Sequence, residues 1–262
     1  SIQNPKSKIQ NHLTPNPLPE AVGAIPGLTA RLPYAERICA RLAEPVDGVP
    51  RAALFKLAVL LHDVAKPQTR ALKPDGGVSF YDHQSIGAEV AWEVTRRLRL
   101  SRAAGEYVRL IVREHMRPGQ LNELGSALTE RAVYRFFRAT GEAGPEVLLH
   151  SLCDHLAMKG PHLRAEDWHD HVEWTAKMLE AFYERSETIR PQPMVRGDDL
   201  MRELGLAPGP EIGRLLEEVR EAQAAGEIHT RDEALELARR SSVVMRHALL
   251  VRQQEDEQRA KA

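Results

Sequence analysis

The chain has 262 residues, a length that predicts one large domain with a small appendage. Hydrophobic residues make up 42% of it and charged residues 28%, which excludes a disordered, collagen-like or membrane-spanning composition. Its 36 Lys and Arg residues are balanced by 37 Asp and Glu residues, so no global basic field draws it onto nucleic acid. Two cysteines, Cys39 and Cys153, are too few for a disulfide framework and indicate the reducing cytoplasm. The longest apolar run, residues 54–61, is far shorter than the ~20 residues of a membrane span.

Proline and glycine residues divide the chain into segments with helical patterns. Residues 1–24 contain four prolines and few apolar residues, which predicts a flexible leader. From Tyr34 onward the apolar residues recur at helical spacing with little strand alternation, so we predict an all-α chain built as a helical bundle. The segment VSFYDH is expected to be extended over two residues at most. A proline-rich break near residue 191 separates a large helical domain, 25–190, from a C-terminal helical tail domain, 191–262.

The C-terminal domain is predicted to form a helical hairpin. Pro210 stands in the first turn of a helix that Gly226 ends. Thr230 and Glu233 have the spacing of a capping box, in which each side chain accepts a hydrogen bond from the other residue's backbone amide. A second helix is therefore expected to begin there. The last stretch, residues 251–262, is predicted to be a solvated helix end.

Ionisable residues within apolar helices are the candidates for chemistry. His62 and Asp63 end the apolar helix LFKLAVLLHDVAKP, where burying them without partners would cost several kcal/mol. A divalent cation would compensate, since a neutral imidazole and a carboxylate are both ligands for Zn, Mn, Fe or Mg. His83, His115 and Asp154 follow, each among apolar neighbours. The sequence therefore predicts a metal site, against the alternative that each histidine is a hydrogen-bonded structural residue.

The remaining histidines are assigned by their helical position. His150 shares a helix face with Asp154 at a spacing of four residues, which makes it the best substitute ligand. The others are predicted to be surface residues: His12, His155, His162, His169, His171, His229 and His247.

At LFKLAVLLHDVAKPQTR the chain resembles the HD-domain metal-dependent phosphohydrolases, whose pattern is a histidine, then His-Asp, then a distant aspartate. The segments DGGVSFYDHQSIGAEVA, VRLIVREHMRP and LTERAVYRFFRATG follow in order. With the tail DDLMRELGLAPGPEIGRLLEEV they resemble the C-terminal body of bacterial class II tRNA nucleotidyltransferases and poly(A) polymerases that carry an HD domain. The resemblance runs from about Ala52 to Arg240.

The chain departs from this pattern in two places. The residues before Ala52 contain neither the Gly-rich loop nor the strand pattern of a nucleotidyltransferase head, so the chain is not expected to add nucleotides by itself. The leading histidine of the HD pattern is expected one helix before His62, and PYAERICARLAE (residues 33–44) contains none. His12 is a poor replacement. A site that lacks one ligand is expected to bind its metal less tightly.

The resemblance implies a set of residue roles. His62, Asp63 and Asp154 would bind a divalent metal ion (Mn, Mg, Ni, Fe or Zn), with His83 and His115 completing a second position. Together with His62 and Asp63, Lys66 would act in catalysis by directing its ammonium at a bound phosphate; alternatively, it is an ordinary helix C-terminal cation. The implied activity is metal-assisted hydrolysis of a phosphoester, in a nucleotide, a cyclic phosphate or an RNA terminus.

A second set of residues raises the question of nucleic-acid binding. Arg131, Arg135 and Arg138 lie on one predicted helix face with Tyr134 and Phe137 nearby, an arrangement that could follow the phosphate backbone of tRNA or another RNA. The alternative is a solvated helix face. The competing functions are therefore a phosphohydrolase, a non-catalytic tRNA-binding module, and the body half of a split tRNA nucleotidyltransferase.

Overall fold

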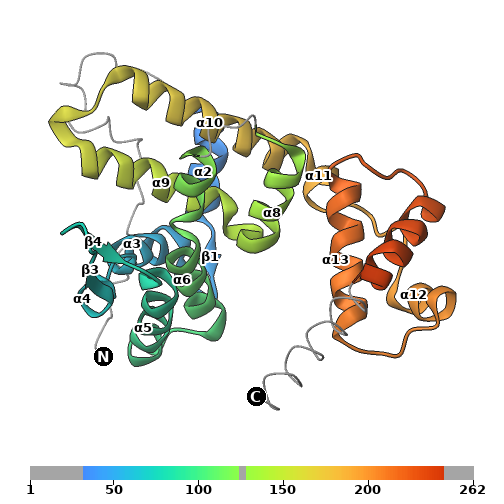
Figure 1. Ribbon diagram of the computed structural model, residues 1–262. Helices are drawn as coiled ribbons and strands as arrows, with labels where there is room; N and C mark the ends of the chain where they lie inside the picture. The colour runs from blue at the N-terminus through green and yellow to red at the C-terminus, as the bar shows by residue number, and fades with distance from the viewer. Residues whose placement is uncertain (1–31, 124–127, 245–262) are drawn as a thin grey trace, which may run out of the picture.

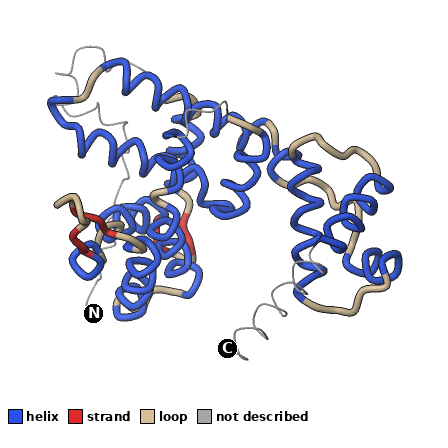
Figure 2. Tube along the Cα trace, viewed as in Figure 1, coloured by secondary structure: helices blue, strands red, loops and turns tan. Residues whose placement is uncertain are grey.

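The structure, a computed structural model, describes residues 32–123 and 128–244. Helices form nearly all the regular structure of this part, with two short β-hairpins (Figure 2). The prediction of an all-α chain is thus confirmed. The expected leader, 1–24, and the expected helix end, 251–262, lie outside the described residues.

The elements fall into two groups along the chain (Figure 1). The first comprises α2 (Ala35–Ala43), β1 (Pro45–Val46), β2 (Val49–Pro50), α3 (Arg51–Leu61), α4 (Lys66–Thr69), β3 (Arg70–Leu72), β4 (Val78–Phe80), α5 (His83–Arg97), α6 (Arg102–Glu114), α7 (Arg117–Glu123), α8 (Glu130–Thr140), α9 (Gly144–Lys159), α10 (Ala165–Glu184) and α11 (Ser186–Ile189). The second comprises α12 (Gly197–Leu204), α13 (Pro210–Ala224) and the helical residues 231–244.

Each group has its own hydrophobic core. The larger core joins α2, α3, α5, α6, α8, α9 and α10, and its fully buried members include Phe136, Ile111 and Leu148. The smaller core lies between α12, α13 and the helix at 231–244, around Leu200 and Leu215. Burial of these apolar faces is the main stabilising term for such helices, because a helix of about 10 to 15 residues is marginal alone.

Helices α5 and α6 pack closely against each other. At Gly105 in α6, a Cβ atom would lie 2.8 Å from the Trp92 ring of α5, so only glycine permits this approach. The two helices are antiparallel and about 22 and 20 Å long, from 15 and 13 residues at 1.5 Å each. The start of α5 therefore lies beside the end of α6.

Two segments differ from expectation. The strand in VSFYDH has three residues, Val78–Phe80, and pairs antiparallel with Arg70–Leu72, because the Asp-Gly turn ahead of it, with Gly76 at φ +83°, closes a hairpin. Prolines were expected to separate the helical segments, but Pro118 is the second residue of α7, where a helix does not need its backbone N–H.

The C-terminal hairpin forms as predicted. Pro210 begins α13, and Gly226 follows its end at φ +70°. The backbone N–H of Glu233 donates to Thr230 Oγ1, and that of Thr230 donates to the Glu233 carboxylate, both at 3.2 Å. The capping box is therefore present. Among the described residues, no helix has both the length and the apolar character needed to cross a bilayer.

Candidate metal centre

Four of the five candidate ligands lie where helices end or begin. His62 directly follows α3, whose apolar residues are buried in the core, and Asp63 comes next. His83 is the first residue of α5, and His115 directly follows α6. Asp154 comes from the middle of α9. The antiparallel pairing of α5 and α6 brings two of these histidines to one end of the bundle.

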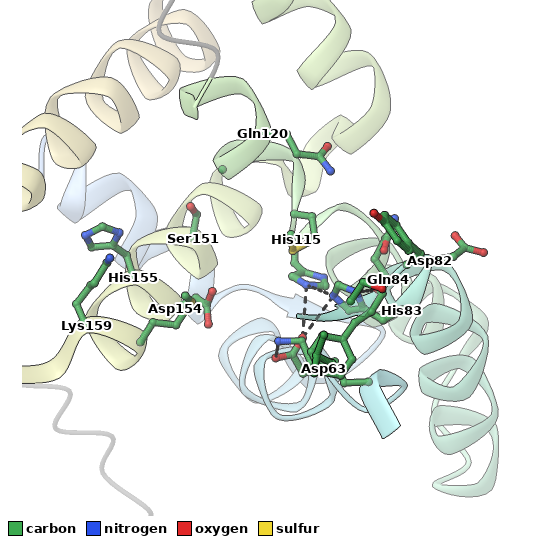
Figure 3. A pocket seen from close by; sticks show the side chains of 18 of the residues that line it. Asp63, Asp82, His83, Gln84, His115, Gln120, Ser151, Asp154, His155 and Lys159 are labelled. Carbon is green, nitrogen blue, oxygen red and sulfur yellow. Dashed lines mark hydrogen bonds and ion pairs between the residues drawn. The ribbon is translucent and has the colours of Figure 1, made fainter. Parts of the chain in front are cut away.

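The five side chains form one cluster, in which the ligand atoms of Asp63, His83 and His115 lie within 4.8 Å of one another and His62 connects Asp63 to Asp154. His62 Nε2 lies 3.2 Å from Asp63 Oδ2 and 3.6 Å from Asp154 Oδ1. The Nε2 atoms of His83 and His115 lie 3.5 and 3.8 Å from Asp63 Oδ1 and 3.3 Å from each other (Figure 3). Two donors that each bind a cation at about 2.1 Å lie roughly 3.0–3.4 Å apart. These separations are close to those of a metal ligand set.

Hydrogen bonds orient the three histidine rings. In His62, His83 and His115, the Nδ1 atom lies 2.7 Å from the carbonyl oxygen of the residue three positions earlier. These carbonyls belong to Val59, Phe80 and Val112 in that order. A carbonyl only accepts, so Nδ1 carries a proton, and in the neutral form of each ring the lone pair of Nε2 points to the centre. The neutral rings of His83 and His115 would then bring two lone pairs within 3.3 Å of each other. A cation between them would replace this repulsion with two bonds.

The charges at the centre are strongly coupled. Burial alone would raise the pKa of Asp63, but hydrogen bonds from His62 and Lys66 outweigh it and hold that pKa well below its usual range. Burial opposes protonation of His62, yet the Asp63 carboxylate and the Val59 carbonyl raise its pKa. Lys66 Nζ lies 2.6 Å from Asp63 Oδ2 and 5.6 Å from the centre of the Phe80 ring. The carboxylate is therefore ionised and stabilised from two sides.

His150 lies beside this cluster without a hydrogen-bond partner. It is 1% exposed, and neither of its ring nitrogens meets a donor or acceptor among the described residues. Its ring centre lies 4.7 Å from that of His62 and 5.6 Å from that of His115. Burial, with the charges of those two histidines, lowers its pKa to about 3. An uncharged imidazole is thus held at the centre, one helical turn before Asp154.

The centre opens into a cleft of about 740 Å³. Burial lowers the pKa of His115 to about 4 at its deep side, while Asp63 and Asp154 keep about a third of their side-chain surface exposed. A cation bound here would therefore remain reachable from the cleft. The side chains that line the rest of the cleft include Phe80, Tyr81, Gln84, Gln120, Ser151, His155, Met158, Lys159 and His171 (Figure 3).

The predicted arginine face lies elsewhere and is already paired. Arg131 binds Glu221 and Glu227, and Arg135 also binds Glu221, at 2.5–2.6 Å. Arg138 binds Glu217 at 3.1 Å, and both Glu217 and Glu221 belong to α13. The face thus joins α8 to the C-terminal unit through ion pairs, and the side chains of Arg135 and Arg138 remain 61% and 59% exposed. Binding of RNA by these residues stays a prediction.

Two histidines were assigned wrongly to the surface. His171 is 6% exposed, and its Nε2 lies 3.0 Å from Ser151 Oγ. The His155 ring lies edge-on against it at 4.8 Å and is partly buried. A signal was available in the sequence, because Trp168, Val172 and Thr175 place residue 171 on the buried stripe of α10.

Known protein families match most of the described chain. The family model of the HD domain matches residues 34–159, which hold every candidate ligand. The family model of the putative tRNA nucleotidyltransferase domain 2 matches residues 149–238.

Curated relatives match the same region. The chain is 33% identical over 182 residues to the A-adding tRNA nucleotidyltransferase of Deinococcus radiodurans. The aligned region makes up 69% of this chain and 40% of that protein. It is 35% identical over 188 residues to the CC-adding enzyme of Thermus thermophilus, with 71% and 39% coverage. The chain thus spans about two fifths of the length of these relatives. The chain contains an HD domain followed by a tRNA nucleotidyltransferase domain 2, and over about 70% of its length it is homologous to the C-terminal body of the A-adding and CC-adding tRNA nucleotidyltransferases.

Proposed function

We propose that the chain is a divalent-metal-dependent phosphohydrolase of the HD class. One observation carries the proposal: the donor atoms of Asp63, His83 and His115 lie within 4.8 Å of one another, and His62 connects Asp63 to Asp154. A backbone carbonyl holds each of the three histidine rings in the tautomer that a metal requires. A structural role alone would not need the lone pairs of His83 and His115 to face each other.

The proposed ligand set includes His150. His62, Asp63, His83, His115 and Asp154 supply imidazole and carboxylate donors, which suit Mn, Fe, Ni, Zn or Mg, and no thiolate takes part. The leading histidine of the HD pattern is absent from α2. The unpartnered, uncharged ring of His150 stands within reach of the cluster and would take its place.

The cation supplies Lewis acidity toward a phosphoryl oxygen and a nucleophile at neutral pH. The protein's own residues do the rest. The carbonyls of Val59, Phe80 and Val112 hold the imidazoles in place. Lys66 stabilises ionised Asp63 and lines the cleft, where its ammonium would offset negative charge on the phosphoryl group.

Metal loading and hydrolysis test this function together. Chelator-treated protein is reloaded with Mn²⁺, Ni²⁺ or Mg²⁺ and assayed on p-nitrophenyl phosphate and 2′,3′-cyclic AMP. Asp63→Asn is expected to lose bound metal and at least ~100-fold in kcat/KM, because it removes the shared carboxylate. Asp198→Asn, an exposed aspartate in α12, serves as the control. Equal metal content and activity in both variants would refute the proposal.

A second candidate function, tRNA binding, is favoured by the match at residues 149–238 to a tRNA nucleotidyltransferase domain. In this case the chain would act as an RNA-binding module, or as the body that works with a separate nucleotidyltransferase head. Binding would weaken steeply with salt, because Lys and Arg contacts release counterions. Gel shifts with tRNA at 50 to 200 mM salt measure this. Asp63→Asn should bind tRNA as the wild type does, which separates the two functions.

A further inference from the structure

One face of α9 extends the cleft beyond the metal centre. Ser151, Asp154, His155, Met158 and Lys159 recur at intervals of three and four residues, so they share one side of the helix, and all of them line the cleft. In Figure 3, Asp154 lies between the metal-centre residue Asp63 and the pair His155 and Lys159. The cleft therefore leads from the metal along α9 to a basic end.

This basic end offers unused hydrogen-bond donors. Lys159 is exposed and has no ion-pair partner in the described part of the chain. The His155 side chain lines the same end, and its Nε2 atom has no hydrogen-bond partner among the described residues. This atom is shielded from solvent, so the ring must turn for it to donate to a ligand. Ser151 and His171 bond to each other at 3.0 Å and close the wall behind them. Lys66, at the other end of the cleft, is engaged by Asp63.

The size and lining of the cleft exceed what one phosphate needs. A volume of about 740 Å³ lies in the range of pockets for small organic ligands, about 300–1,000 Å³. Tyr81 and Met158 also line it, and they are 76% and 73% exposed. An exposed aromatic ring and a thioether are surfaces on which a flat base can stack.

We infer that Lys159 and His155 form a second phosphate subsite, so that the preferred substrate is a nucleotide with a phosphate on each side of its ribose. Asp154 and Lys159 are five residues apart, about 7.5 Å along the helix axis. This is comparable with the separation of successive phosphates along an extended nucleic-acid strand. One phosphate would lie at the metal centre and the next at Lys159, with the base near Tyr81. The inference rests on the proposed function for the first phosphate only.

Binding measurements test the subsite without relying on turnover. Calorimetric titration of Mn²⁺-loaded protein compares adenosine 3′,5′-bisphosphate with the 3′- and 5′-monophosphates, and chromatography checks each ligand for breakdown. The bisphosphate is expected to bind about tenfold more tightly than either monophosphate, as a charge-assisted contact predicts. In Lys159→Gln this ratio should fall to about one, and in His155→Gln it should fall in part.

Lys177→Gln is the matched control. It removes one exposed ammonium from α10, outside the cleft, and should keep the tenfold ratio. Equal affinities in the wild type, or a ratio that survives Lys159→Gln, would overturn the inference. A tenfold ratio without hydrolysis of any phosphoester would uphold the subsite and refute only the hydrolase. A short RNA with phosphates at both ends distinguishes the source: tighter binding than the free bisphosphate identifies an RNA terminus, and equal binding identifies a free nucleotide.

Discussion

The histidines of the centre satisfy the ends of the helices they follow. Val59 and Val112 lie in the last turns of α3 and α6, where backbone carbonyls have no partner within the helix. The rings of His62 and His115 donate to these carbonyls and aim their other nitrogen outward. One hydrogen bond therefore stabilises a helix end and orients a ligand, which explains why these ligands directly follow helices.

Replacement of His150 tests whether its side chain binds the metal or only fills space in the core. His150→Leu is expected to lower Mn²⁺ affinity about tenfold or more, because one donor is lost. The metal-free protein should be equally stable or more stable, since a buried polar group without partners costs about 1–3 kcal/mol. Equilibrium dialysis and thermal unfolding in chelator measure the two effects. Unchanged Mn²⁺ affinity would exclude His150 from the ligand set.

Buried His171 makes the stability of the metal-free protein depend on pH. Burial, with the charge of His155, lowers its pKa to about 4 from the ordinary 6.5. Below pH 6.5 His171 becomes protonated in the unfolded chain but stays neutral in the folded chain. The free energy of unfolding is therefore highest near pH 7 and falls as the pH decreases towards 4. The loss is roughly 2–3 kcal/mol.

Denaturant titrations between pH 7.5 and 4.5 check this dependence. His171→Gln should flatten the pH profile relative to the wild type, whereas His169→Gln, at an exposed position of the same helix, should leave it unchanged. A wild-type slope retained in His171→Gln would contradict the assignment.

The sequence predicts the ligands better than their surroundings. His62, Asp63 and Asp154 stand out because ionisable residues interrupt apolar helices, and that local pattern needs no knowledge of the fold. The burial of His171 could also have been predicted, from the apolar stripe of α10. The contact between Ser151 and His171 could not, because it depends on how α9 and α10 meet in space.

At the scale of elements, a buried ion cluster connects α2 and α3 to α9. Glu146 of α9 is fully buried, and its Oε1 lies 2.9 Å from Arg41 Nε and 3.6 Å from an Arg51 guanidinium nitrogen. Burial raises the pKa of Glu146, although both arginines oppose the rise. The cluster fixes the position of α9, which carries Asp154. No sequence pattern predicts it, since its members come from three separate helices.

Removal of one arginine from this cluster should destabilise the fold. Arg41→Met leaves Glu146 with a single, more distant partner, and the expected loss is about 3 kcal/mol of unfolding free energy. Arg96→Met, which breaks an exposed pair with Glu93, should cost less than about 1 kcal/mol. Urea unfolding of both variants gives the comparison. Equal losses would show that the cluster contributes no more than a surface pair.

At the scale of the whole molecule, charge joins the two units. The acidic side chains of α13 lie one turn apart and match the spacing of the arginines on α8. Tyr134 adds a hydrogen bond to Glu217 at 3.1 Å. The complementary spacing is visible in the sequence, but only the fold shows that the two faces meet. Residues expected to contact RNA therefore hold the C-terminal unit in place.

Charge reversal at this junction should loosen it. Glu221→Arg places a third cation beside Arg131 and Arg135, so the linker between α11 and α12 should be cleaved faster in limited proteolysis. Adding Arg135→Glu, which keeps the pair between Arg131 and Glu227, gives residue 221 an opposite charge again and should restore part of the resistance. Glu236→Arg, on the exposed side of the last described helix, should have no effect. Unaltered cleavage of Glu221→Arg would mean that the ion pairs do not hold the junction.

Two helix C-termini meet at the candidate metal centre, and they affect the order in which the metal cation and a phosphate compound can bind. Helices α3 and α6 both end there, so their C-termini add partial negative charge to that of Asp63 and Asp154, although α4, α5 and α7 begin nearby and Lys66 and Lys159 line the cleft. The two carboxylates repel an anion from the metal position of the bare protein, so the cation is expected to bind there before the phosphate does. Chelation would therefore weaken the binding of phosphate compounds as well as stop their cleavage, and product would leave before the metal does.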